Sequence, residues 1–246
     1  MPPTSASERR EELKRVYDEA RVCTRCPQLA QTRTQVVFGA GNANADLMFV
    51  GEAPGRDEDE QGLPFVGRSG KLLNTLLEEI GLRREDAFVV NTLKCRPPGN
   101  RDPHPAEIDN CQDYLLRQVA LIEPTVICTL GNFSTKLLRG DPTGITKLHG
   151  KPEVLTIGSR AVHLYPLFHP AAALYTPSNV EVLRADFARI PELLAAGPPP
   201  QPAGAQEPEP AVPEPAVAES PEPRPGPDAE PGWAARDEPE SQLGLF

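Results

Sequence analysis

Residues 47–56 read LMFVGEAPGR, and this stretch decides the fold. Its first four residues, Leu47–Val50, form a short apolar run that is typical of a buried strand, and turn-forming residues follow immediately. Three more apolar runs bounded by turn residues lie further along the chain, at Phe88–Val90, Val126–Leu130 and Val162–Phe168. The sequence therefore predicts four buried strands.

Helical patterns lie between and around these runs. An amphipathic helix is predicted at Ser7–Ala20, with Ser7 as its N-cap. Further helices are predicted at Ser69–Ile80, Pro105–Ile122, Asn132–Leu138 and Asn179–Leu194. Strands that alternate with helices form parallel β-α-β units. We therefore expect an α/β protein, folded as a three-layer α/β/α sandwich.

The C-terminal part of the chain differs in composition from the rest. Residues 197–246 contain 14 of the 30 prolines, and their ten acidic and two basic side chains supply most of the net charge of −10. A tract with so few large apolar residues cannot bury enough surface to offset the entropy of ordering it. We expect a folded domain over residues 1–196 and a disordered acidic tail over residues 197–246.

The same composition excludes several classes of protein. No apolar run approaches the ~18 residues that a membrane-spanning helix needs. The N-terminal segment lacks the apolar stretch of a secretory signal. A cytoplasmic protein without membrane contact is expected, and there cysteines more often bind metal or act chemically than form disulfides. The acidic charge does not exclude nucleic acid, because the near-neutral domain can still present a basic face.

The loops after three of the predicted strands carry polar side chains. Glu52 follows the first strand, Asn91 the second and His169 the last. In parallel sheets the chemistry gathers at the carboxyl ends of the strands, so we expect these side chains to converge on one pocket. Taken singly, each has a structural alternative: His169 as a structural histidine, Asn91 as a turn or capping residue, and Glu52 as a helix-capping carboxylate.

The chain has five cysteines. Cys23 and Cys26 form a C-x₂-C pair, and 15 residues separate Cys95 from Cys111. Four thiolates suffice for a tetrahedral zinc ion or an iron–sulfur cluster, and the spacing does not decide between them. A C-x₂-C pair can also be a redox dithiol. Cys128 lies inside an apolar strand and is expected to be a small buried hydrophobe.

Three longer motifs, taken together and in this order, resemble the family 4 uracil-DNA glycosylases. They are GEAPGRDEDEQGLPFVGRSGKLL at 51–73, NTLKCRPPGNRDPHPAEIDNC at 91–111 and HPAAAL at 169–174. The match covers roughly residues 10–195. It implies a central four-stranded parallel sheet between helices. It also implies that a 4Fe–4S cluster, rather than zinc, is held by Cys23, Cys26, Cys95 and Cys111.

The resemblance also implies a uracil pocket lined by Glu52, Ala53, Pro54, Phe65, Asn91 and His169. In that pocket Phe65, otherwise a core residue, stacks on the base, Asn91 reads its polar edge, and His169 reaches its O2 side. A base must be extruded from the stack before such a pocket can hold it. An asparagine amide offers one donor and one acceptor, which match O4 and N3–H of uracil and mismatch the amino group of cytosine. The catalytic residues implied are Glu52, Asn91 and His169.

The sequence departs from the better-known branch of the superfamily at two positions. Ala53 stands where that branch has an aspartate that activates water, and Gly55 where it has a bulky aromatic residue that excludes thymine. Glu58 is our candidate for excluding the thymine methyl group. Glu52 is the candidate for orienting water or stabilising an oxocarbenium-like sugar. The acidic run Asp57–Glu60 is otherwise expected to be a solvated loop.

The last five residues, Gln242–Phe246, read QLGLF and form an apolar cluster after the acidic tail. They resemble the pentapeptide with which bacterial proteins bind the sliding clamp. The resemblance implies that the residues which bind the clamp are Gln242, Leu243, Leu245 and Phe246. The alternative is a hydrophobic chain end without a function.

Together these features predict a monomeric, monofunctional uracil-DNA glycosylase of the bacterial cytosol. It would flip uracil out of DNA, hydrolyse the N-glycosidic bond and leave an abasic site for base excision repair. No lysine stands among the implied pocket residues as an amine nucleophile, so the DNA backbone is expected to stay intact. Two other functions stay open: a metal-dependent nuclease, and a non-enzymatic iron–sulfur adaptor that the clamp tethers to DNA. The nuclease would use as metal ligands Glu52, Asp57, Glu58 and Asp59.

Overall fold

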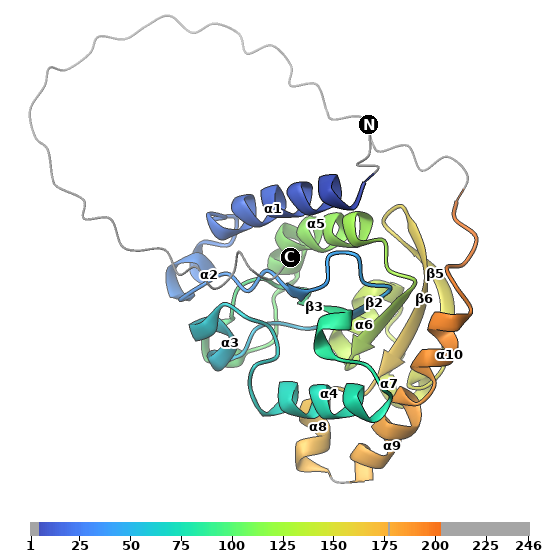
Figure 1. Ribbon diagram of the computed structural model, residues 1–246. Coiled ribbons are helices and arrows are strands. Elements are labelled where there is room, and N and C mark those ends of the chain that lie inside the picture. The colour runs from blue at the N-terminus through green and yellow to red at the C-terminus, as the bar shows by residue number, and fades with distance from the viewer. Residues whose placement is uncertain (1–4, 177, 203–246) are drawn as a thin grey trace, which may run out of the picture.

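The computed structural model describes residues 5–176 and 178–202. These residues form a six-stranded sheet in the order β1-β3-β2-β4-β6-β5, which lies at the centre of the molecule (Figure 1). Its strands are β1 (Ala40–Gly41), β2 (Leu47–Gly51), β3 (Ala87–Asn91), β4 (Val126–Leu130), β5 (Glu153–Ile157) and β6 (Arg160–Leu167).

The four inner strands, β3-β2-β4-β6, are parallel. This confirms the predicted strands and the four-stranded parallel sheet. The two edge strands are antiparallel to their neighbours and were not predicted. β1 has only two residues, and β5 alternates between buried and exposed side chains, with Val154 56% exposed. Neither edge strand therefore contains the continuous apolar run by which the inner strands were found.

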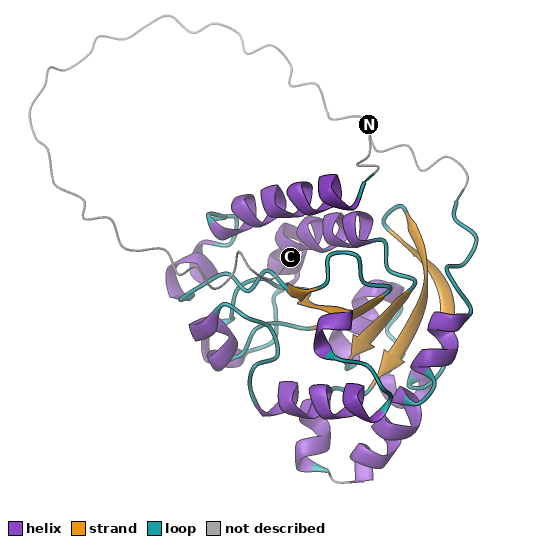
Figure 2. Cartoon of the chain, in the orientation of Figure 1, coloured by secondary structure: helices purple, strands orange, loops and turns teal. Residues whose placement is uncertain are grey.

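Helices cover both faces of the sheet (Figure 2). They are α1 (Ala6–Arg21), α2 (Pro27–Thr32), α3 (Arg56–Gln61), α4 (Arg68–Glu79), α5 (Pro105–Ile122), α6 (Asn132–Arg139), α7 (Ile145–Leu148), α8 (Pro170–Tyr175), α9 (Ser178–Phe187) and α10 (Ile190–Ala195). Short 3₁₀ turns occupy Arg84–Asp86 and Pro98–Asn100. In the described residues, no helix combines the length and the apolar character needed to cross a membrane.

Successive strand residues point to opposite faces and so build two cores. Met48 belongs to the core that contains Leu13 of α1 and Val119 of α5. Its neighbour Phe49 belongs to the other core and stacks on Phe187 of α9, with ring centroids 5.8 Å apart. Strands buried on both faces carry continuous apolar runs, as the inner strands do here. The arrangement confirms the α/β/α sandwich.

Two predicted helix boundaries were wrong. The N-cap of α1 is Ser5, not Ser7, and Ser5 and Glu8 each bond the other's backbone N–H in a capping box. The helix predicted over Asn179–Leu194 is two helices, because Pro191 lies in the first turn of α10. A proline has no N–H to donate there and would interrupt one continuous helix.

The acidic run Asp57–Glu60 was predicted as a solvated loop, and it forms most of α3 instead. Acidic side chains in the first turn of a helix are stabilised by the helix dipole. Asp59 is buried, and both of its carboxylate oxygens accept from the backbone N–H of Thr34, at 3.0 and 3.1 Å. This carboxylate therefore anchors α3 to the segment after α2.

Residues beyond position 196 continue to pack on the folded domain. The amide of Gln201 bonds both backbone groups of Ala161, at 3.0 Å each, and the His163 ring bonds the Gly197 carbonyl, at 3.0 Å. Both contacts lie near the start of β6. The tail and clamp motif predicted further along the chain lie outside the described residues.

Candidate active site

The carboxyl ends of β2, β3 and β6 bring the predicted polar side chains together. Glu52 follows β2, Asn91 ends β3, and His169 lies two residues after β6. All three line one cavity of about 390 Å³. The other predicted pocket residues, Ala53, Pro54 and Phe65, line the same cavity. The loops therefore converge as expected from the sheet topology.

His169 is the N-cap of α8, and its surroundings fix its tautomer. The Nδ1 atom accepts from the backbone N–H of Ala171 at 3.0 Å. Burial lowers the pKa of His169 to about 4. The ring is therefore neutral at pH 7, and its proton is on Nε2, because Nδ1 acts as an acceptor.

Phe65 lies beside this imidazole, with ring centroids 5.6 Å apart and a 28° angle between the planes. Its backbone has φ +53°, a left-handed conformation that bulky residues seldom adopt. A Cβ on Gly51 would lie 2.8 Å from Phe65 Cζ and closer still to Asn91 Oδ1. Glycine at position 51 thus allows the aromatic ring and the amide to reach the strand end.

Glu52 is half-buried, and burial raises the pKa of its carboxyl group, with a smaller contribution from the Asp102 charge. Its backbone carbonyl accepts from the N–H of Leu93 at 3.0 Å and from the Thr92 hydroxyl. These bonds join the loop after β2 to the loop after β3. The backbone of Glu52 is therefore fixed at the cavity by the loop after β3.

Glu58 of α3 also lines the cavity. Its Oε1 atom accepts from the Gly67 N–H at 3.3 Å. A Cβ built on Gly55 would lie only 2.6 Å from Glu58 Oε2. The carboxyl group of Glu58 therefore occupies the space that a side chain at position 55 would fill.

The ligand set of the alternative nuclease does not come together. Asp59 faces Thr34, away from the cavity-lining Glu52 and Glu58, and Asp57 forms an ion pair with Arg56, at 3.5 Å. Within residues 5–176 and 178–202, no group of three or more His, Cys, Asp or Glu side chains is arranged to hold a single metal ion. The acidic loop thus has structural partners and does not form a carboxylate metal site.

Four of the five cysteines line a second, smaller cavity: Cys23, Cys26, Cys95 and Cys111. Cys128 is elsewhere, fully buried in β4, as predicted. The second cavity has no acidic residue in its lining, and several apolar side chains close it. These are the four cysteines that the sequence resemblance selected.

Two guanidinium groups donate to two of the sulfur atoms. Arg33 Nη1 lies 3.2 Å from Cys95 Sγ and also donates to the Cys23 carbonyl at 2.8 Å. Arg25 Nε lies 3.4 Å from Cys23 Sγ, and its guanidinium carbon is 4.4 Å from the centroid of the Tyr114 ring. Cationic donors favour the negatively charged form of a sulfur ligand.

The other two sulfur atoms receive neutral donors. Asn110 Nδ2 lies 3.7 Å from Cys26 Sγ, and the Lys94 backbone N–H lies 3.3 Å from Cys111 Sγ. Each of the four cysteines thus accepts one N–H. Sulfur ligands of metal clusters commonly receive such bonds, which influence the properties of the cluster.

Lys94 is a buried neighbour of Asn91 that the sequence analysis missed. It is only 1% exposed, and Nζ donates to the Asn91 carbonyl at 2.8 Å and to Gln118 Oε1 at 2.7 Å. Burial lowers the pKa of this amine to about 7. Lys94 therefore joins β3 to α5 between the two cavities. A lysine is rarely fully buried, so composition gave no signal for it.

His149 likewise has partners that were not predicted. Its Nδ1 atom lies 2.9 Å from Asp186 Oδ2, and its ring centroid is 4.4 Å from that of Phe168. The contact joins the turn after α7 to α9. It lies outside the set of residues that line either cavity.

Comparisons with known proteins assign this arrangement to a family. Residues 38–192 match the sequence model of the uracil DNA glycosylase superfamily. The type-4 uracil-DNA glycosylase of Archaeoglobus fulgidus is 46% identical over 187 residues, which are 74% of this chain and 94% of that protein. That of Sulfurisphaera tokodaii is 46% identical over 186 residues, 74% of this chain and 84% of that protein. The chain therefore belongs to the type-4 uracil-DNA glycosylase family.

A bacterial relative agrees with the archaeal ones. The type-4 uracil-DNA glycosylase of Thermotoga maritima is 45% identical over 172 residues, 69% of this chain and 88% of that protein. The matched part of the chain includes the pocket at the strand ends. The family resemblance of the sequence motifs is confirmed.

Proposed function

We propose that this protein removes uracil from DNA in the cavity at the carboxyl ends of β2, β3 and β6. The observation that carries the proposal is the convergence of Glu52, Asn91 and a neutral His169 on one cavity of about 390 Å³. A pocket of this kind can hold a single base that has been flipped out of the DNA stack. The activity is that of a monofunctional DNA repair glycosylase.

The pocket offers both stacking and hydrogen bonds to a uracil ring. Phe65 supplies an aromatic face. The amide of Asn91 pairs with O4 and N3–H, and cytosine would place a donor opposite the amide N–H. Glu58 fills the space beside Gly55 and thereby excludes the methyl group of thymine. Uracil is the base that satisfies all three contacts.

Hydrolysis breaks the bond between C1′ of the sugar and N1 of uracil, and the bonding electrons leave with the base. His169 Nε2–H donates to O2, where negative charge develops, and its neutral form has a proton to give to this bond without adding a buried charge. Glu52 orients the water that attacks C1′ and stabilises the positive charge on the sugar. The water oxygen forms the new C1′ hydroxyl and gives up one proton, which ends on N1 of the departing base, so the products are free uracil and an abasic site.

The amine of Lys94 is unsuited to act as a nucleophile. Its Nζ atom is buried and donates to Asn91 and Gln118, and it lines the cysteine cavity, not the base pocket. Lyase chemistry needs a free amine within reach of C1′. This supports hydrolysis by water without cleavage of the DNA backbone.

We propose further that the four cysteines at the second cavity hold a 4Fe–4S cluster. Four sulfur atoms with one N–H donor each, and no carboxylate, suit thiolate ligation. When bound, the cluster supplies metal–thiolate bonds that cross-link the α1–α2 turn, the loop after β3 and α5. Iron analysis tests this: Cys23→Ala should lose iron, whereas Cys128→Ala should keep about four irons per chain. Zinc in an active, iron-free protein would contradict the proposal.

The proposed C-terminal partner is the bacterial sliding clamp, bound by the QLGLF sequence at 242–246. These residues lie outside the described part of the chain. Support comes from the sequence itself, in which a glutamine precedes a Leu-Phe pair, and from a function on DNA that a clamp would assist.

A glycosylase assay on a uracil-containing oligonucleotide tests the proposed function. The iron-loaded full chain should release free uracil, and chelation of divalent metal ions should not stop it. His169→Ala should lower the rate of base release by roughly 10²–10³, the effect of losing one donor to a developing oxyanion. Asn91→Asp should weaken uracil recognition, because an acceptor then faces O4. Parental rates in both variants would show that the pocket is assigned wrongly.

The same assay separates the two alternative functions. Strand cleavage that depends on a divalent metal ion would indicate a nuclease. DNA binding without release of any base would indicate an adaptor.

A further inference from the structure

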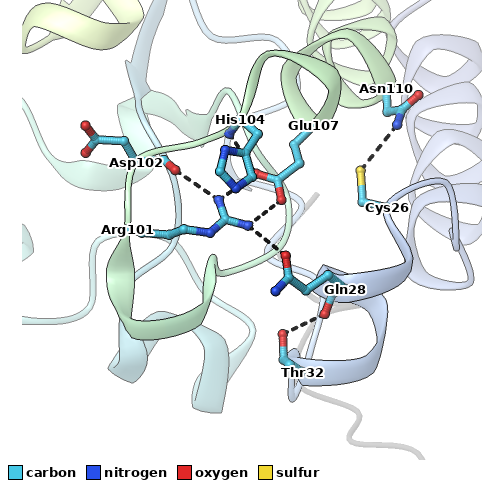
Figure 3. Close-up of polar contacts among 8 residues, drawn as sticks. All are labelled: Cys26, Gln28, Thr32, Arg101, Asp102, His104, Glu107 and Asn110. Carbon is cyan, nitrogen blue, oxygen red and sulfur yellow. Dashed lines mark hydrogen bonds and ion pairs between the residues drawn. The ribbon is translucent and has the colours of Figure 1, made fainter.

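Arg101 lines the base pocket and is held by four hydrogen bonds. Nη1 donates to Glu107 Oε2 and to the Asp102 carbonyl, at 2.9 Å each. Nη2 donates to Glu107 Oε1 at 2.6 Å and to Gln28 Oε1 at 3.2 Å. Figure 3 shows the guanidinium group between Glu107 and Gln28. Both Nη atoms are therefore engaged in fixing the side chain.

Glu107 is the buried partner of this pair. It lies in the first turn of α5, and its Oε2 atom also accepts from the His104 backbone N–H at 2.8 Å. The Arg101 guanidinium holds the pKa of the Glu107 carboxyl below its usual range. A bidentate pair between a guanidinium and a carboxylate fixes orientation as well as distance. The pair therefore sets the position of the loop that connects Arg101 to α5.

The contacts of Arg101 reach α2, whose N-cap is Cys26, and α5, which contains Cys111. Gln28 lies two residues after Cys26, in the first turn of α2. Glu107 lies one helical turn before Cys111 on α5. Asn110 of α5 also contacts the turn before α2, since its Nδ2 donates to the Arg25 carbonyl at 3.0 Å. The same Nδ2 donates to Cys26 Sγ at 3.7 Å (Figure 3).

On its other side Arg101 belongs to the wall of the base pocket. Pro97 and Asn100, from the same loop, line the pocket with it. The next residue, Asp102, adds to the rise in the pKa of Glu52. This loop starts immediately after Cys95 and Arg96, so it leaves the cysteine cavity, forms the pocket wall and returns to α5. Arg101 bonds α2 and α5 from within the wall.

We propose that Arg101 is a positioning residue through which the cysteine-bearing elements hold the wall of the base pocket, so that each site stabilises the other. The proposal rests on the function and the cluster proposed above. Coupling between two sites is reciprocal for binding free energies. Filling the base pocket should therefore stabilise the iron-loaded form, and we expect this stabilisation to appear as slower loss of iron. Weakening the Arg101 pair should remove the effect of the filled pocket on iron loss.

The experiment uses the iron-loaded full chain and measures the rate of iron release to a chelator. The probe is a single-stranded oligonucleotide with one 2′-fluoro-2′-deoxyuridine, whose fluorine disfavours positive charge on the sugar, so the base stays attached. In the parent, saturating probe should slow iron release by roughly fivefold or more, the lower range of allosteric coupling. In Arg101→Lys, which keeps the charge but loses the bidentate geometry, the probe should slow release by less than twofold.

Arg117→Lys is the matched control. Arg117 forms a bidentate pair with Glu19 that joins α5 to α1, at 2.5 and 3.0 Å, and it lines neither cavity. This variant should show the parental slowing of iron release. Steady-state kinetics give a second readout: Arg101→Lys should raise the KM for uracil-containing DNA about fivefold or more with kcat retained, whereas Arg117→Lys should change neither.

A second variant keeps the proposal testable if Arg101→Lys folds poorly. Glu107→Gln retains an acceptor for the His104 N–H and removes the charge that pairs with Arg101, so it should also reduce the slowing by the probe. The inference is overturned if the probe slows iron release equally in the parent and in a folded variant, or fails to slow it in the parent. Failure of the proposed function is a different result, namely no uracil release from ordinary substrate by the parent.

Discussion

His169 reaches the pocket with Nδ1 already occupied by the Ala171 N–H, and burial holds its pKa near 4. A histidine of unperturbed pKa would be partly protonated near neutral pH. Here the fold removes that charge and fixes the remaining proton on Nε2. At pH 7 a neutral His169 does not lower the free energy of unfolding, but in acid it does.

We expect His169 to make the fold acid-sensitive. An unfolded histidine titrates near 6.5, whereas folded His169 titrates near 4. Between these values the unfolded chain binds more protons, so the free energy of unfolding falls as the pH falls from 6.5 to about 4. Above 6.5 the ring is neutral in both states. Between pH 7 and pH 5 the free energy of unfolding should therefore fall by roughly 2 kcal/mol less in His169→Gln than in the parent.

Thermal unfolding at the two pH values measures this difference, which corresponds to about 4–8 °C in the midpoint. An equal fall in the free energy of unfolding in the parent and in His169→Gln would contradict the lowered pKa of His169.

Glu58 carries a prediction about which bases are accepted. Glu58→Ala should open the space beside Gly55 and admit the methyl group of thymine. The ratio of kcat/KM for uracil to that for thymine opposite guanine should fall by roughly 10–100-fold, the effect of a methyl-sized change in a pocket. Glu60→Ala, on the exposed side of the same helix, should leave the ratio unchanged. Thymine rejection that survives Glu58→Ala would assign the exclusion to another residue.

At the scale of elements, α5 contacts the buried Lys94 through Gln118. This side chain is fully buried, accepts from Lys94 Nζ and donates to the Phe38 carbonyl at 2.9 Å. Lys94 Nζ donates two hydrogen bonds, one to the Asn91 carbonyl and the other to Gln118 of α5. Leaving a buried polar group without a partner costs more free energy than the hydrogen bond itself contributes to stability.

We expect Gln118→Leu to destabilise the fold by about 2–3 kcal/mol, which lowers the thermal midpoint by about 5–10 °C. The double variant Lys94→Met/Gln118→Leu should be more stable than Gln118→Leu alone, because it no longer buries an unsatisfied amine. Gln112→Leu, on an exposed position of the same helix, is the control. A double variant less stable than the single one would refute the pairing.

The elements that could be predicted from the sequence are those whose signal is local. The inner strands were found because burial on both faces gives continuous apolar runs, and α5 was found with its observed limits, Pro105–Ile122. The edge strand β5 was missed because one of its faces is exposed. The helix α3 was missed because its four consecutive acidic residues resemble a solvated loop.

The residues of the candidate site likewise fall into those that the sequence predicted and those that it did not. Glu52, Asn91 and His169 were predicted because topology alone brings strand ends together. Arg101 and Lys94 were not, because their roles depend on Glu107, Gln28 and Gln118, which only the packed structure places beside them. Their sequence neighbours give no sign of these partners.

At the scale of the whole molecule, the C-terminal pentapeptide carries a prediction. Deleting Gln242–Phe246 should leave uracil release from a short oligonucleotide unchanged, because the described residues that line the pocket all precede position 177. The deletion should abolish binding to the sliding clamp, in which Leu245 and Phe246 are the proposed apolar anchors. We expect the intact chain to bind the clamp with a Kd of about 1 μM, near −8 kcal/mol.

Titration of clamp binding compares the intact chain with two deletions. Removing residues 211–230 instead should preserve binding, provided that the shortened linker still spans the two sites. Equal affinities of the intact chain and the five-residue deletion would show that QLGLF does not bind the clamp.

The last described residues lie at the amino end of β6, where Gln201 pairs with Ala161, whereas the proposed base pocket lies beyond the carboxyl end of the same strand. At about 3.3 Å per residue the two places are roughly 26 Å apart along β6. A partner bound through residues beyond 202 would therefore be attached to the domain at the end of β6 opposite the proposed base pocket. Tethering would then raise the local concentration of substrate and leave turnover of the bound site unchanged.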